Sequence, residues 1–168
     1  MRLFAAIHFT EPFRKAVLDY QASLKRAAVS GNFSRPENLH MTLAFIGEVR
    51  DASASLRAVK CVQFEPFEMK LSGSGRFGGG SSGALYWLGV ESGKKAEALA
   101  AEVRAALAGE GVPFDTKPFK AHITLAREVE LGGSPFRAKV PEASMTVSRI
   151  SLMKSERING KLIYTEIK

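Results

Sequence analysis

The chain has 168 residues, close to the length of one domain, and 45% of them are hydrophobic, enough for a core without cross-links. Its single cysteine excludes an intrachain disulfide and fits a reducing compartment. No segment approaches the roughly 20 apolar residues of a membrane helix, and the apolar start is too short for a signal peptide. We therefore expect a cytoplasmic protein without a membrane partner, and take it to be a monomer. The net charge of +7 favours polyanionic partners.

The first third of the chain predicts a strand, a helix and a second strand. Residues 2–9 form an apolar run that is typical of a buried strand. Thr10 is suited to cap a helix, because apolar residues recur at intervals of three and four over residues 13–27. A Gly-Asn pair at 31–32 is expected to end this helix. After a polar link, residues 39–46 predict the second strand.

A second helix is expected after Asp51, which is placed to cap it. Leu56, Val59 and Val62 would form its apolar face. Cys61 falls in the same helix, and a buried structural cysteine is the favoured interpretation.

The segment over residues 72–83 is rich in glycine and serine and follows a predicted strand at 67–71. It lacks the Gly-Lys-[Ser/Thr] ending of a phosphate-binding P-loop, and apolar strand residues follow it rather than a helix. We therefore predict a flexible hairpin connection. Arg76 and Phe77 within it are candidates for contact with a substrate.

The second half of the chain repeats the order of strand, helix and strands. A helix is predicted from Ser92 to about Leu107, with Gly109 ending it. The strands flanking this helix and those that follow the Gly-rich loop at 132–135 are expected at 84–90, around the second histidine motif at 122–126, at 144–153 and at 161–167. An Asn-Gly turn at 159–160 would join the last two strands.

Because this order recurs, the sequence predicts a duplicated α+β unit, that is, a single domain over residues 1–168 made of two pseudo-symmetric lobes. Each half has one long helix ahead of a strand that carries a histidine. The two histidine-bearing strands would then face each other across a cleft.

The most informative feature is a repeated five-residue pattern, His-Met-Thr-Leu-Ala at 40–44 and His-Ile-Thr-Leu-Ala at 122–126. Two of the three histidines of the chain lie in it. A strand places residues i and i+2 on one face, so each histidine and its threonine point the same way while the apolar residues point into the core. The two strands together would offer two imidazoles and two hydroxyls to one small site.

These groups suit acid–base chemistry on a phosphate. An unperturbed imidazole has a pKa of about 6.5, so one histidine can be charged while the other is neutral near physiological pH. Cleavage of a P–O bond needs a base to activate the attacking oxygen and an acid to protonate the departing one. The hydroxyls of Thr42 and Thr124 can donate to the non-bridging oxygens. Arg127 is expected on the same face as His122, where its charge would stabilise the transition state.

Other interpretations of the histidines are weaker. A single His-x-Thr usually means a satisfied polar pair, but a repeat in a chain with three histidines is hard to assign to chance. A zinc site is disfavoured, because no carboxylate or thiol stands at ligand spacing beside His40 or His122. We therefore expect no metal and no cofactor. His8 lacks the pattern and is interpreted as structural or as marginal to the site.

At these residues the chain resembles the 2H phosphoesterase superfamily, and most closely its RNA 2′,3′-cyclic phosphodiesterase family, also called 2′-5′ RNA ligases. Ala121 is a small departure, because the family often has proline there. The resemblance covers nearly the whole chain and rests on residues 2–7, 35–47, 87–90, 119–127 and 152–155, with Gly160 and Tyr164.

The resemblance implies two antiparallel sheets that face a central cleft, with helices outside. It also implies metal-independent hydrolysis of RNA 2′,3′-cyclic phosphate ends to 2′-phosphomonoesters, reversible as 2′-5′ ligation. His40 would be the proton donor and His122 the proton acceptor, while by residue chemistry alone the two are interchangeable. Thr42, Thr124 and Arg127 would hold the phosphate.

Further residues are candidates for contact with the RNA. Lys120 and Arg35 would guide the strand by charge, and Phe9, Phe45 or Phe119 would stack on a base if they are not part of the core. The alternatives are an enzyme acting on 2′-5′ linkages or small cyclic nucleotides, and a non-catalytic RNA-binding module.

Overall fold

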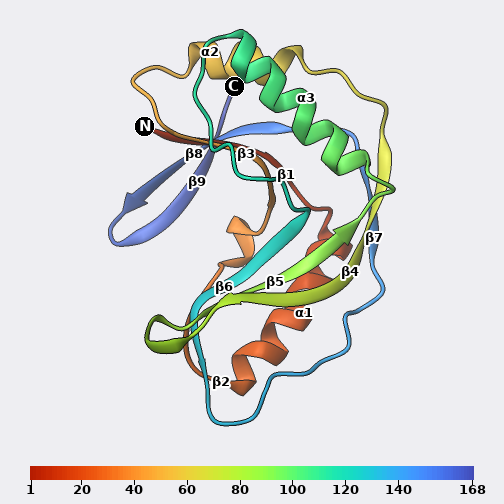
Figure 1. Ribbon diagram of the computed structural model, residues 1–168, viewed down its shortest axis with the longest axis vertical. Coiled ribbons are helices and arrows are strands. Elements are labelled where there is room, and N and C mark those ends of the chain that lie inside the picture. The colour runs from red at the N-terminus through yellow and green to blue at the C-terminus, as the bar shows by residue number, and fades with distance from the viewer.

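The computed structural model describes residues 1–168 and consists of two antiparallel sheets with helices on their outer sides (Figure 1). The four-stranded sheet has the order β3-β1-β8-β9, and its strands are β1 (Arg2–Ile7), β3 (Met41–Glu48), β8 (Ser151–Ile158) and β9 (Lys161–Ile167). The five-stranded sheet has the order β2-β6-β5-β4-β7, and its strands are β2 (Ala28–Phe33), β4 (Phe67–Gly78), β5 (Ala84–Glu91), β6 (His122–Leu131) and β7 (Ser144–Val147).

The long helix of each half of the chain packs on the sheet that contains the histidine strand of the other half. The helices are α1 (Glu11–Ala27), α2 (Ser53–Cys61) and α3 (Lys95–Gly109), with short 3₁₀ turns η1 (Pro36–Asn38) and η2 (Gly80–Ser82). α1 packs against β2 and β6 of the five-stranded sheet, and α3 packs against β3 of the four-stranded one. Each long helix therefore covers the sheet that holds the other half's histidine strand. None of the helices is both long and apolar enough to cross a membrane.

The histidine strands are built by alternation, as predicted. Met41, Leu43, Ile123 and Leu125 are all but fully buried in the core between sheets and helices. β3 and β6 contact each other where the two sheets meet. The faces of these strands that carry His and Thr are therefore left for the space between the sheets.

The end of the first helix was predicted wrongly. α1 stops at Ala27, and Ala28 is already extended, with φ −82° and ψ 140°. The Gly-Asn pair at 31–32 lies inside β2, whose Asn32 and Phe33 pair with Arg127 and Ala126 of β6. Pairing with a strand almost one hundred residues away in sequence overrides the local turn preference of glycine and asparagine.

The Gly/Ser-rich segment is mostly strand rather than flexible loop. β4 runs to Gly78, so the hairpin connection to β5 is only residues 79–83. A Cβ atom at Gly75 would overlap the indole ring of Trp87, its partner in the strand pair. Glycine here makes room for a large neighbour, which sequence composition alone does not reveal.

Two further expectations need correction, and one is confirmed. The single strand predicted at 144–153 is divided between β7 and β8, which belong to different sheets, because the chain crosses from one sheet to the other at residues 148–150. Cys61 lies in α2 as predicted but is exposed rather than buried. Asn159 and Gly160 form the β8–β9 turn with φ of 50° and 77°, as a tight Asn-Gly hairpin requires.

Gln21 of α1 forms hydrogen bonds that hold β6, the second histidine strand, against the helix. Its buried amide donates to the carbonyl oxygens of Ser34 at 2.8 Å and Leu125 at 2.9 Å. We predict that Gln21→Leu lowers the free energy of unfolding by about 1–3 kcal/mol, because both buried carbonyls lose a donor. Urea unfolding would measure this. Lys15→Leu, an exposed change on the same helix, is the control, and equal effects of the two variants would contradict the prediction.

Candidate active site

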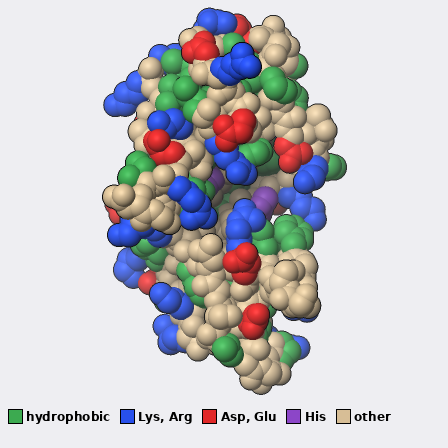
Figure 2. Space-filling model, turned by 90° about the vertical axis from the view of Figure 1, so that its left-hand side faces the viewer, with side chains coloured by type: hydrophobic (Ala, Val, Ile, Leu, Met, Phe, Trp, Pro, Cys, Tyr) green, Lys and Arg blue, Asp and Glu red, His purple; other side chains and the backbone are tan.

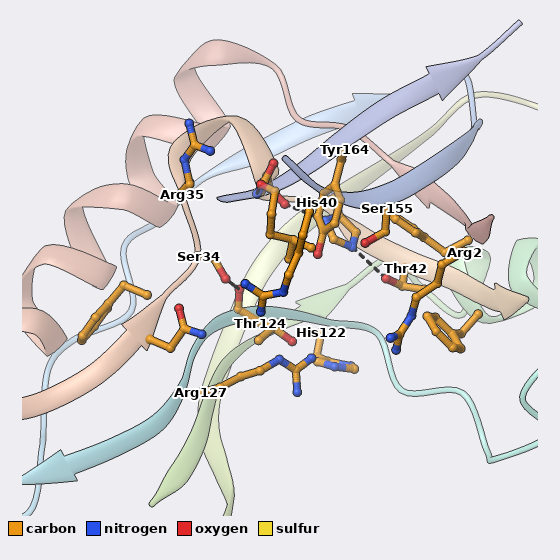
Figure 3. Close-up of a pocket in the computed structure, with 17 residues that line it drawn as sticks. Arg2, Ser34, Arg35, His40, Thr42, His122, Thr124, Arg127, Ser155 and Tyr164 are labelled. Atoms are coloured by element: carbon orange, nitrogen blue, oxygen red, sulfur yellow. Dashed lines mark hydrogen bonds between the residues drawn. The ribbon is translucent and has the colours of Figure 1, made fainter. Parts of the chain in front are cut away.

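The cleft between the sheets has a volume of about 480 Å³ and brings together His40, Thr42, His122 and Thr124 (Figure 3). Figure 2 shows histidine side chains inside a hollow of the surface that is bordered by lysines and arginines. The other lining residues are Arg2, Phe4, Asn32, Phe33, Ser34, Arg35, Asn38, Phe45, Arg127, Ser155, Arg157, Leu162 and Tyr164. The structure thus collects both predicted His-Thr pairs in one place.

Both histidines make the same contact with the backbone. Nδ1 of His40 lies 2.7 Å from the carbonyl oxygen of Asn38, and Nδ1 of His122 lies 2.7 Å from that of Lys120. A carbonyl oxygen only accepts, so Nδ1 of each ring carries a proton and donates it. Nε2 of each ring is therefore the nitrogen that can exchange a proton in the cleft.

The two histidines enter the cleft from the beginnings of their strands. His122 is the first residue of β6, and His40 immediately precedes β3. The strand was predicted at 39–46, but β3 begins two residues later, at Met41, and runs to Glu48. The 3₁₀ turn η1 ends at Asn38 and presents the carbonyl that holds His40.

The surroundings of His40 are aromatic. Its ring centroid lies 4.8 Å from that of Phe4 and 5.2 Å from that of Tyr164, which meets it edge-on. Its Nε2 lies 2.9 Å from Oγ1 of Thr42, so in the neutral ring the hydroxyl donates to this nitrogen. His122 is flanked instead by Phe77 and Trp87, both edge-on at more than 6 Å.

Burial lowers the pKa of His40 from 6.5 to about 4. The hydrogen bond to the Asn38 carbonyl opposes this shift, while the charges of His8, Arg127 and His122 add to it. At neutral pH and with the cleft empty, His40 is therefore uncharged. Burial also raises the pKa of the neighbouring Tyr164, which stays a neutral phenol.

Arg127 reaches the cleft through an irregularity in β6. Strict alternation would place its side chain on the other face of β6 from His122, since the two residues are an odd number of positions apart. However, β6 advances two residues, from Thr124 to Ala126, where β5 advances only from Trp87 to Tyr86. This bulge returns the Arg127 side chain to the cleft face. The expectation of a shared face is correct in outcome, but its cause is not simple alternation.

The two other predicted cations differ in position. Arg35 lines the cleft, where it forms an ion pair with Glu37. The side chain of Lys120 is not among the lining residues, and its ammonium lies 5.4 Å from the centroid of Phe77 instead. The contribution of Lys120 inside the site is its carbonyl, which accepts from His122.

The remaining sequence candidates fall mostly outside the cleft. Phe9 is buried in the core and Phe119 packs against it, whereas Phe45 lines the cleft with the guanidinium of Arg2 4.9 Å from its centroid. His8 is half-buried, and its Nε2 lies 3.2 Å from Sδ of Met153. No three His, Cys, Asp or Glu side chains are grouped as metal ligands would be.

Sequence reasoning missed the polar residues that the four-stranded sheet supplies. Arg2 of β1 pairs with Ser155 of β8, which pairs in turn with Tyr164 of β9, so the three side chains stand in one row on the cleft face. Arg157, two residues after Ser155, joins them. The period-two alternation of β8 carries this signal, but only once its strand partners are known.

The chain belongs to the 2′-5′ RNA ligase superfamily, whose sequence model matches residues 11–159. It is 31% identical to the RNA 2′,3′-cyclic phosphodiesterase of Methanothermobacter thermautotrophicus over 186 aligned residues, covering 99% of this chain and 96% of the relative. The family predicted from the paired histidine motifs is therefore confirmed.

Solved structures agree with the predicted architecture of two antiparallel sheets facing a cleft with helices outside. The protein TT0787 of Thermus thermophilus matches with a TM-score of 0.80 and 26% identity, over 100% of this chain and 96% of that one. LigT of E. coli in apo form matches with a TM-score of 0.78 and 28% identity, over 99% and 94%. LigT structures complexed with 3′-AMP and with phosphate match as well.

We predict that His40 titrates near pH 4 in the free protein and that inorganic phosphate raises its pKa. Burial opposes the charged ring, and a bound anion favours it. NMR titration of the imidazole resonances would measure both values. His8 is the internal comparison, because it lies outside the cleft and senses phosphate only through its charge interaction with His40, so its shift should be much smaller. Titration of His40 at an ordinary 6.5 without phosphate would contradict the prediction.

Proposed function

We propose that the protein hydrolyses RNA 2′,3′-cyclic phosphate ends to 2′-phosphomonoesters by metal-independent acid–base catalysis. The observation that carries this proposal is the pair of imidazoles in one cleft, each with Nδ1 bonded to a carbonyl, so that Nε2 remains to exchange a proton. In the empty cleft, Nε2 of His40 meets the Thr42 hydroxyl. The name of the Methanothermobacter relative supports the same substrate. We take the chain to act as a monomer, as one domain of two pseudo-symmetric lobes.

In the proposed reaction, Nε2 of His122 takes a proton from water as the water oxygen attacks phosphorus. Nε2 of His40 gives its proton to the ribose 3′ oxygen as the P–O3′ bond breaks. The products are a 2′-phosphate and a 3′-hydroxyl. With a ribose 5′-hydroxyl in place of water as the nucleophile, the same proton transfers would join two RNA ends through a 2′-5′ bond, and their reversal would cleave such a bond.

The threonines and arginines would hold the phosphate between the two rings. The hydroxyl of Thr124 can donate to one non-bridging oxygen, and the hydroxyl of Thr42 can donate to the other once Nε2 of His40 is protonated and no longer accepts from it. The guanidinium of Arg127 can neutralise the charge that grows on these oxygens. Arg35, which lines the cleft, would attract the RNA strand by its charge.

The acid role of His40 depends on the substrate itself. In the empty cleft burial keeps its pKa at about 4, so the ring lacks the proton that it must give. The negative charge of a bound phosphodiester raises this pKa, so His40 becomes protonated when the substrate binds. A free ring that stays neutral also avoids a further positive charge among the arginines.

The proposed function is tested by product analysis on an RNA with a defined 2′,3′-cyclic phosphate end, in the presence of EDTA. We expect complete conversion to the 2′-phosphate. Release of the 3′-phosphate would show that the 2′ oxygen leaves instead of the 3′ oxygen. Loss of all turnover in EDTA would contradict the metal-free mechanism. Cleavage of 2′-5′ dinucleotides or small cyclic nucleotides alone would identify the alternative enzymes.

We predict that His40→Ala and His122→Ala each lower kcat by roughly 10²–10⁴-fold, because each removes one proton transfer. Steady-state hydrolysis of a 2′,3′-cyclic nucleotide would measure this. His8→Ala is the matched control, since it removes the only other histidine, and its kcat should stay within a few-fold of wild type. Turnover within a few-fold in either cleft variant would rule out the paired roles.

A second substrate can separate the acid from the base. A p-nitrophenyl phosphodiester releases an aryloxide that is stable as an anion and needs no proton. We predict that His40→Ala loses much less activity on this substrate than on the cyclic phosphate, whereas His122→Ala loses as much on both. The ratio of kcat/KM for the two substrates measures the difference. The opposite pattern would exchange the two roles.

A further inference from the structure

Two aromatic rings lie beside His122 outside the phosphate cleft. The ring centroids of Phe77 and Trp87 are 5.5 Å apart with a tilt of 33°, and the two rings lie 6.3 Å and 6.4 Å from the His122 ring. Neither ring is among the residues that line the cleft. We call Phe77 and Trp87 the aromatic pair.

Strand register places the aromatic pair on the same face as the catalytic groups. Trp87 of β5 is opposite Thr124 of β6, and Gly75 of β4 is opposite Trp87. Phe77 follows Gly75 by two residues and so shares its face. The absence of a side chain at Gly75 lets the indole ring lie across the strand, which brings it next to Phe77.

The aromatic pair is not explained by core packing. Phe77 is 41% exposed, one of only four large hydrophobic residues in the structure that are exposed. The indole N–H of Trp87 is buried without an acceptor, so a smaller apolar residue would serve a packing role better. The ammonium of Lys120 lies 5.4 Å from the Phe77 centroid, which puts a positive charge at the same spot.

We propose that the aromatic pair is a stacking platform for the nucleobase next to the phosphate that reacts. An exposed ring beside the catalytic histidine offers a flat apolar face to a base, and Lys120 offers a charge to the adjoining backbone phosphate. Every base has a π face, so the platform selects nucleotides over other phosphate esters without selecting a base. This inference rests on the proposed function, since it assumes a nucleotide in the cleft.

The platform can be tested by binding alone, because Trp87 is the only tryptophan of the chain. Adenosine 2′-phosphate and ribose 2-phosphate carry the same phosphate and differ in the base. We expect adenosine 2′-phosphate to change the tryptophan fluorescence and to bind roughly tenfold more tightly than ribose 2-phosphate. Equal affinities for the two compounds would overturn the platform.

Substitutions test whether the preference for the nucleotide arises at Phe77. Phe77→Ala should abolish the difference between the two ligands by weakening only the nucleotide, and Phe77→Tyr should retain it. Arg76→Ala is the matched control, because Arg76 is the adjacent residue but faces a different hollow beside Tyr20 and Tyr86. Equal weakening of both ligands by Phe77→Ala would show a general structural role and contradict the proposal.

Turnover distinguishes this inference from the proposed function. If wild type binds adenosine 2′-phosphate in preference to ribose 2-phosphate but hydrolyses no 2′,3′-cyclic nucleotide, the platform stands and the proposed function fails. If it hydrolyses cyclic nucleotides while Phe77→Ala leaves KM unchanged, the proposed function stands and the platform fails.

Discussion

The hydrogen bond from Nδ1 of each histidine to the carbonyl two residues before it is the constraint on which the site depends. It fixes the tautomer of both rings and leaves Nε2 as the only nitrogen that can take or give a proton in the cleft. Both bonds are local in sequence, so each half of the site is prepared by the residues that lead into its own strand. The fold has only to bring the two strands face to face (Figure 3).

The packing of each long helix on the other half's histidine strand explains how the two strands are held in that position. α1 comes from the first half of the chain but packs on β6, and its Gln21 bonds to the backbone of Leu125, next to Thr124. The hydroxyl of Ser34 bonds to the carbonyl of Thr124 from the segment that leads to His40. Each half of the site is therefore supported by residues from the other half, which makes the cleft a product of the whole chain.

Sequence reasoning succeeded where the determinants are local and failed where they are not. Alternation in the two His-x-Thr strands gave the buried and the cleft-facing residues, and Asn159 with Gly160 gave the last turn. β2, the division of β7 from β8, and the glycine at 75 that admits Trp87 all depend on strand partners distant in sequence. Arg127 is instructive, because only the bulge opposite β5 turns it into the cleft.

The equivalence of the two histidines ends with their shared backbone contact. Their surroundings differ: His40 lies close to Phe4 and Tyr164, whereas His122 lies beside Phe77 and Trp87, whose rings are more than 6 Å from its own. A proton placed on a buried imidazole is a strong acid, because the ring returns to its preferred neutral form when it gives the proton away. Such a ring is suited to protonate an alkoxide leaving group, provided that the substrate's own charge has first made it protonated. In the proposed mechanism, burial and the bound phosphate therefore act in opposite directions on the pKa of His40: the phosphate makes the proton present, and burial favours its release.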